Sequence, residues 1–102
     1  MEIQEKAVDR KLLLTFSGEL DHHGARDALR RIELAIDAAL PKTLVLDLGG
    51  LTFMDSSGIA LILRSEKKMG ELDGALRLSH VPTQAVRVLS AAGIDRRLDI
   101  TK

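Results

Sequence analysis

The middle of the chain contains a short, nearly continuous apolar run, TLVLDL, at residues 43–48. A strand with one face in water shows apolar and polar residues in alternation, whereas an unbroken run is typical of a strand that is covered on both faces. This run limits the folds open to the chain, because such a strand needs neighbours on every side. We therefore place residues 43–48 at the centre of a β-sheet and expect both of its faces to be covered.

Apolar patterns on either side of this run predict further strands and helices. The predicted strands cover residues 2–8, 11–19, 75–81 and 97–100, and the predicted helices cover residues 24–40, 59–70 and 83–93. A spacer of hairpin length separates the first two strands, which predicts an antiparallel pair. The later strands alternate with helices, which predicts right-handed crossovers between parallel strands. The sequence thus predicts one α/β domain over residues 1–102, with a mixed β-sheet opened by an antiparallel strand pair, a parallel core and helices packed on it.

Glycine, proline and charged residues predict where these elements end and which faces are solvated. Pro41 ends the first helix, because proline cannot continue the hydrogen-bonding pattern. Residues 49–50, both glycine, predict a turn after the central strand, and Gly70 is expected just beyond the end of the second helix. Asp27 and Arg31 are four residues apart, which predicts an ion pair on the outer face of the first helix.

The composition excludes several classes of function. The 15 basic side chains balance the 15 acidic ones, so the chain lacks the basic surplus that nucleic-acid binding uses. The longest apolar run, residues 59–63, is far shorter than the roughly 20 residues needed to span a membrane. No signal peptide is visible, and the chain has no cysteine for disulfides, thiolate nucleophiles or metal sites. We expect a cytoplasmic protein with no nucleic-acid or membrane partner.

The motif FMDSSG, residues 53–58, has the composition of a helix start. Asp55 is expected at the N-cap, because aspartate accepts hydrogen bonds from the first free N–H groups of a helix. Ser56 and Ser57 then fall in the first turn, where unpaired N–H groups and the helix dipole tolerate a phosphate. The motif can equally be no more than a good helix start.

One alternative is a serine hydrolase. Ser56 would be the nucleophile and His22, His23 or His80 the base. The motif lacks the first glycine of the G-x-S-x-G elbow, and no loop is evident that would stabilise an oxyanion. The residues therefore disfavour this chemistry.

A second alternative is an acidic pocket of the kind found in response-regulator receiver domains. Asp21, Asp47 and Asp55 are acids at predicted strand ends. The chain is too short for five full strand-helix units, however, and it has no lysine placed near a strand end. A phosphate-binding loop of the P-loop type is absent from the sequence.

The cluster ELDHHG, residues 19–24, combines an acid with two adjacent histidines. Such residues can bind a transition metal, but His22 and His23 are neighbours and their side chains would diverge on a strand or a helix. The simpler interpretation is that Asp21 caps the first helix and that the histidines lie at a solvated turn. We expect no metal site. Because such turns collect at the carboxyl ends of parallel strands, Asp21 is expected near Ser56.

Two motifs together carry a family resemblance: GELDHH at residues 18–23 and LTFMDSSGIALIL at residues 51–63. They are similar to those of the anti-sigma factor antagonists of the STAS domain class, most of all the sporulation members. The resemblance runs from the opening strands to the end of the chain. It implies a binding protein rather than an enzyme, without a cofactor, that regulates sporulation transcription; a general stress-response antagonist is the alternative within the family.

The resemblance also implies how such a protein is regulated. Ser56 matches the serine that is phosphorylated by an anti-sigma factor with ATP-dependent serine kinase activity. A PP2C-type phosphatase removes the phosphate. The unphosphorylated antagonist binds the anti-sigma factor and frees the sigma factor, so phosphorylation of Ser56 would switch binding off.

The partner-binding residues implied by the match are Asp21 and Asp55, followed by Ser57, Gly58 and Ile59. The resemblance assigns the two acids to the partner-facing site rather than to catalysis.

The apolar run at residues 59–63 cannot face one sheet along its whole length, because consecutive helical positions are about 100° apart. Either another core element covers its outward side chains or they form the apolar part of the partner interface.

Relatives of this kind usually carry a further C-terminal helix, whereas this sequence ends at residues 99–102. Either the sequence is trimmed or this member closes its sheet differently, and in both cases we expect the surface that the helix would cover to be exposed. A monomer is expected, with an oligomer left open.

Overall fold

The computed structural model describes all residues from 1 to 102, and its regular segments follow the predicted order. The strands are β1 (Glu2–Val8), β2 (Lys11–Leu20), β3 (Thr43–Met54), β4 (Ala75–Ser79) and β5 (Asp99–Ile100). The helices are α1 (His22–Ala39), α2 (Ser56–Glu71) and α3 (Thr83–Ala91), with a short 3₁₀ turn, η1 (Ile94–Arg96), before the last strand.

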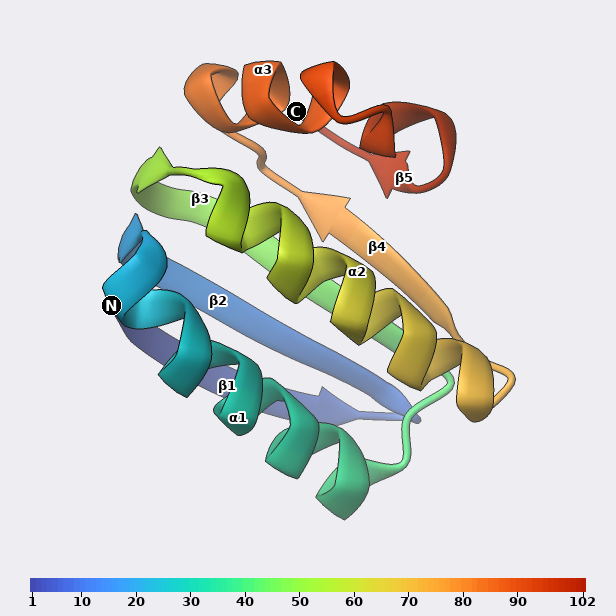
Figure 1. The fold of residues 1–102 in the computed structure, drawn as a ribbon. Helices are drawn as coiled ribbons and strands as arrows, with labels where there is room; N and C mark the ends of the chain where they lie inside the picture. The colour runs from blue at the N-terminus through green and yellow to red at the C-terminus, as the bar shows by residue number, and fades with distance from the viewer.

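The five strands form one sheet in the order β1-β2-β3-β4-β5 (Figure 1). β1 and β2 are antiparallel, and every other neighbouring pair is parallel. The predicted antiparallel opening, the parallel core and the central place of the TLVLDL strand are therefore confirmed. The hairpin between β1 and β2 turns at Asp9 and Arg10, whose φ angles of 50° and 65° are the positive values that a tight two-residue hairpin turn requires.

Only one face of the sheet is covered, so the expectation of cover on both faces was wrong. Leu44, Leu46 and Leu48 point into a single core cluster beneath the helices, and α1 and α2 lie side by side across that face (Figure 1). Val45, between them, is 8% exposed yet lies outside the core cluster. Its register partners are Leu13 of β2 and Arg77 of β4, whose long side chains shield it without a second layer of helices.

β3 is longer than predicted, because residues 49–50 continue the strand instead of turning it. The pairing with β2 shifts register after Thr15, and Ser17 then lies opposite Gly50. A Cβ atom at Gly50 would lie 2.6 Å from the carbonyl oxygen of Phe16. Glycine is needed here for the close approach of two backbones at an irregular point of the sheet.

Two other local predictions were wrong. Gly70 lies inside α2, which ends at Glu71, and Asp73 takes the left-handed conformation beyond it. Asp27 and Arg31 form no ion pair; the Arg31 guanidinium instead donates a hydrogen bond of 2.9 Å to the carbonyl oxygen of Ile3 and ties α1 to β1. None of the helices has the length and apolar character that crossing a membrane would require.

The two glycines give a matched test of the close approach at β3. We expect Gly50→Ala to destabilise the domain by about 1–3 kcal/mol, because the added methyl group must displace backbone. Gly70 is helical with no atom within 4 Å of an added Cβ, so Gly70→Ala should stabilise the domain by up to about 1 kcal/mol. Urea unfolding of both variants measures the difference, and a neutral Gly50→Ala would contradict the proposed contact.

Candidate functional site

Two helix starts lie next to each other at the carboxyl ends of neighbouring strands. β2 and β3 run parallel, and their last residues, Leu20 and Met54, are partners in the register. The N–H of Asp55 donates to the carbonyl oxygen of Leu20 at 3.3 Å and holds the two strand ends together. The chain then enters α1 after Asp21 and α2 after Asp55. The two acids therefore occupy equivalent positions at neighbouring strand ends.

Both acids cap their helices, as predicted. Asp21 Oδ1 accepts hydrogen bonds from the N–H groups of His23 at 3.0 Å and Gly24 at 2.9 Å. Asp55 Oδ1 accepts one from the N–H of Ser57 at 2.8 Å. The hydrogen bond from Gly24 is the largest cause that lowers the pKa of the Asp21 carboxyl from its ordinary value, and the backbone and charge of His23 act in the same direction.

The two serines of the motif differ in their surroundings. Ser56, the first residue of α2, is exposed, whereas Ser57 is half-buried and lines a groove between α1 and α2. Gly58 is buried, and a Cβ atom there would lie 2.6 Å from Met54 Cγ. The glycine of the motif thus lets α2 approach the end of β3, and the hydroxyl that remains open to a partner is that of Ser56.

The apolar run at residues 59–63 divides between the core and the surface. Leu61 and Ile62 are buried, Ile59 and Leu63 are half-buried against the core, and Ala60 is exposed. The expectation that the run cannot face the sheet along its whole length is confirmed. Most of it is nevertheless covered by core contacts.

Gln84, which the sequence analysis missed, supports the site from α3. β4 pairs with β3 only as far as Asp47, so the last residues of β3 have a free edge. The Gln84 side chain occupies this edge at Met54: its Oε1 accepts from the Met54 N–H at 2.9 Å, and its Nε2 donates to the Met54 carbonyl oxygen at 2.8 Å. One amide side chain thus replaces a strand directly before the serines. No sequence signal links positions 30 residues apart.

Phe53 was also missed. It is 39% exposed at the end of β3, while its neighbour Met54 is fully buried. The alternation of side chains along a strand requires one of the two to point outward, and that signal was available in the sequence. An exposed aromatic residue therefore lies close to Ser56 in the chain.

The histidines do not form the other kinds of site that were considered. His22 and His23 pack edge to face with ring centres 5.7 Å apart, and no three potential ligands among histidines and acids come together for a metal ion. His80 Nδ1 lies 3.2 Å from Asp47 Oδ2, but the hydroxyls of Ser56 and Ser57 make no hydrogen bond to any histidine. The arrangement is not that of a serine nucleophile with its base.

A family model for the STAS domain matches residues 2–102. The chain belongs to the STAS domain family. It is 33% identical over 89 residues to an anti-sigma F factor antagonist from Paenibacillus polymyxa, an alignment that covers 87% of this chain and 76% of the relative.

Solved structures of the antagonist SpoIIAA resemble this STAS domain in two states. The unphosphorylated form superposes with a TM-score of 0.85 at 25% identity, over 99% of this chain and 89% of the other. The phosphorylated form from Bacillus gives a TM-score of 0.75 at the same identity, over 99% and 92% of the two chains. The predicted family and fold are thus confirmed.

The cap of α1 predicts an acid-sensitive contribution to stability. Because the folded-state pKa of Asp21 is lowered, the charged cap stabilises the STAS domain above the ordinary aspartate pKa, and this contribution is lost as the pH falls through the lower folded-state value. Asparagine caps helices about as well but does not titrate. We expect Asp21→Asn to lose less stability than the wild type between about pH 5 and pH 2, measured by urea unfolding. Asp27→Asn is the control and should lose stability with falling pH as the wild type does. Equal losses of stability in Asp21→Asn and the wild type would contradict the prediction.

The side-chain bridge from α3 predicts a local effect at Met54. Gln84→Leu removes both hydrogen bonds and should cost about 1–3 kcal/mol. Hydrogen exchange of the Met54 amide should accelerate more than exchange elsewhere in β3. Arg87→Leu, at an exposed position of the same helix, is the control. Unchanged exchange at Met54 in Gln84→Leu would contradict a protective role of the bridge, because an amide that donates to water instead of Gln84 exchanges faster.

Proposed function

We propose that this STAS domain is an anti-sigma factor antagonist whose binding is switched off by phosphorylation of Ser56. Its partner is an anti-sigma factor with ATP-dependent serine kinase activity, and a PP2C-type phosphatase restores the binding form. The domain acts by binding, without catalysis or a cofactor. The names of its relatives and the two solved states of SpoIIAA support this proposal.

The observation that carries the proposal is the exposed hydroxyl of Ser56 at the start of a helix that is already capped. The helix dipole and free N–H groups of the first turn tolerate a phosphate, so the domain need not unfold when one is added. Asp55 supplies the cap, and Ser57 is half-buried where it lines the groove. Ser56 is therefore the more accessible of the two serines to a kinase.

The partner-binding surface surrounds Ser56. Asp21 and Asp55 lie at neighbouring strand ends on this side of the sheet, and Ser57, Gly58 and Ile59 continue the first turns of α2. We include these five residues in the partner-binding site, with Gly58, which is buried against Met54, supporting it from beneath.

Electrostatics explains why a phosphate would change binding and not folding. Phosphorylation adds about −1.5 to −2 charges beside Asp55. A partner fitted to a neutral hydroxyl must then desolvate or repel a concentrated negative charge. Complete switching from 99:1 bound to 1:99 needs about 5.5 kcal/mol of differential affinity. A buried like-charge contact together with lost hydrogen bonds supplies a term of this size.

The relatives favour a role in sporulation, because one relative is named an anti-sigma F factor antagonist and one of the similar solved structures is that of SpoIIAA. An antagonist in a general stress response remains the alternative pathway. The local chemistry at Ser56 is the same in both cases.

Phosphorylation at Ser56 is tested by intact-mass spectrometry after incubation with ATP and the cognate anti-sigma factor kinase. We expect one phosphate on the wild type and on Ser57→Ala, and none on Ser56→Ala. The matched pair of serine variants separates the two hydroxyls. An unmodified wild type in the presence of an active kinase would refute the switch.

A charge mimic tests the consequence for binding. Ser56→Asp should lose affinity for the anti-sigma factor while its thermal unfolding stays like that of the wild type, since the helix start accepts negative charge. A mimic that still binds tightly would contradict the electrostatic account.

A further inference from the structure

A groove lies between the N-terminal halves of α1 and α2 and reaches Ser57 at one end. Its volume is about 450 Å³. Its more buried lining, the floor, is apolar and includes Leu29 and Leu61, and its exposed rim carries Arg26, Arg30 and Arg64. In Figure 1 both helices begin at the same end of the molecule, so their positive dipole ends are also directed there.

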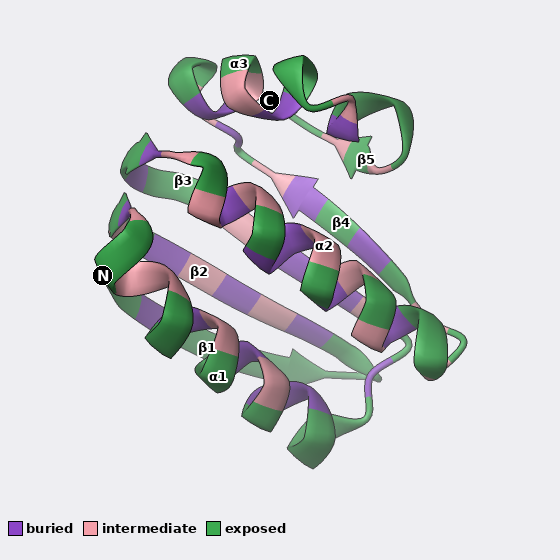
Figure 2. Cartoon of the chain, in the orientation of Figure 1, coloured by how far each residue is buried: buried purple, intermediate pink, exposed green.

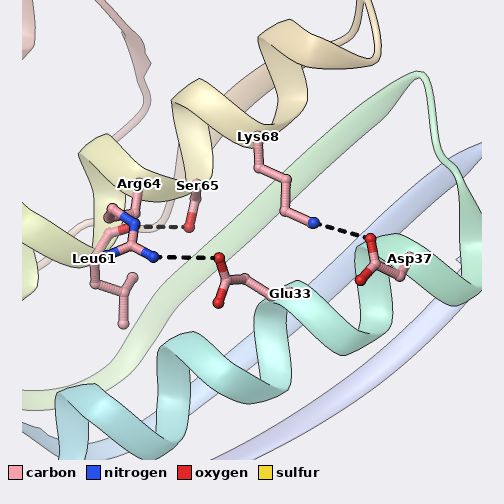
Figure 3. A network of polar contacts seen from close by, with 6 residues as sticks. All are labelled: Glu33, Asp37, Leu61, Arg64, Ser65 and Lys68. Carbon is pink, nitrogen blue, oxygen red and sulfur yellow. Dashed lines mark hydrogen bonds and ion pairs between the residues drawn. The ribbon is translucent and has the colours of Figure 1, made fainter.

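The seam between the two helices changes character along its length. In its C-terminal half the cations of α2 are paired with acids of α1: Arg64 lies 3.6 Å from Glu33, and Lys68 lies 2.9 Å from Asp37 (Figure 3). The hydrogen bond to Asp37 also raises the pKa of Lys68. In this half, the domain supplies its own counter-charges.

No ion pair joins the two helices in the N-terminal half. Arg26 and Arg30 are exposed, form no ion pair within the domain, and are four residues apart on the same helix face. Like charges at this spacing destabilise a helix. With Arg64 and Glu33 the groove carries a net charge of about +2, although the whole chain is neutral. A concentrated charge next to the proposed switch is therefore left for something outside the domain to neutralise.

We propose that this groove binds an acidic segment of the anti-sigma factor partner, whose carboxylates pair with Arg26 and Arg30. The inference rests on the proposed function and adds to it the chemistry of a second contact. The apolar floor accepts the aliphatic part of the segment, and the arginines pair its carboxylates in two-pronged hydrogen bonds.

This contact also links the groove to the phosphate. Ser57 lines the groove, and Ser56 is its neighbour in the first turn of α2. Arg26 lies only about one helical turn, a rise of roughly 6 Å along the helix axis, from the start of α1. A phosphate of about −1.5 to −2 charges at Ser56 nearly cancels the groove's positive charge and repels an acidic segment. The switch then acts on the whole groove as well as on contacts to the hydroxyl.

The test compares two double variants that change the net charge of the domain by the same amount. Arg26→Gln with Arg30→Gln removes the unpaired cations of the groove. Arg87→Gln with Arg96→Gln removes two exposed arginines without ion pairs from α3 and η1. Affinity for the purified cognate anti-sigma factor is measured by calorimetry at several salt concentrations, and circular dichroism checks that each variant is folded.

We expect the groove variant to bind about tenfold or more weakly and with a shallower salt dependence, and the control variant to bind like the wild type. Equal affinity of the groove variant would overturn the inference, as would equal weakening of both variants, which would indicate only the effect of net charge. If the groove holds a second copy of the domain, the groove variant would change self-association but not partner affinity. If it holds a free anion, the groove variant would change the shift of Tm that inorganic phosphate causes, again without changing partner affinity. Either result would overturn the inference. A wild type that binds no anti-sigma factor would refute the proposed function itself.

Discussion

The parallel pairing of Leu20 with Met54 fixes the geometry on which the site depends. Because of this pairing, β2 and β3 end at the same level, and the helices that follow them, α1 and α2, begin side by side. The two caps follow one residue later, and both side chains of the pair are fully buried. A slip of one residue would turn Met54 outward and separate the helix starts. The site is therefore positioned by apolar burial in the strands, and its polar residues only complete the arrangement.

The same geometry leaves a weakness that the fold compensates. β3 runs beyond the end of β4 so that its last residue lies beside the last residue of β2. The close contact at Gly50 lies within this extension. In Figure 2, β3 continues past the tip of β4. The extension has one unpaired edge, and Gln84 occupies that edge at its last residue. The long central strand, the glycine within it and the glutamine on α3 thus act together to hold the end of β3 beside the end of β2. They connect α3 mechanically to the start of α2, although α3 contributes no residue to the proposed interface.

Much of this could be predicted from the sequence, where the signal was local. The helix caps at Asp21 and Asp55 follow from residue type and spacing, and the antiparallel opening pair and the parallel core follow from the pattern of elements. The errors arose where long-range contacts override local preference. Residues 49–50, both glycine, are typical of a turn, yet Gly50 pairs with Ser17 of β2 and the strand continues. Arg31 has an acid at the right helical spacing, yet the Ile3 carbonyl lies within reach and takes its hydrogen bond.

Asp55, Ser56 and Ser57 have separate roles, which explains how one short motif can serve both folding and regulation. Asp55 already satisfies the N–H of Ser57, so the start of α2 needs nothing from the Ser56 hydroxyl. A group added at Ser56 therefore neither completes nor breaks a cap, and its free-energy effect on folding is small compared with its effect on a docked partner. A serine that itself served as the N-cap would couple the two, because modifying its hydroxyl would disturb the helix. Placing the acid one residue earlier separates stability from recognition, which is what a binding switch on a small domain requires.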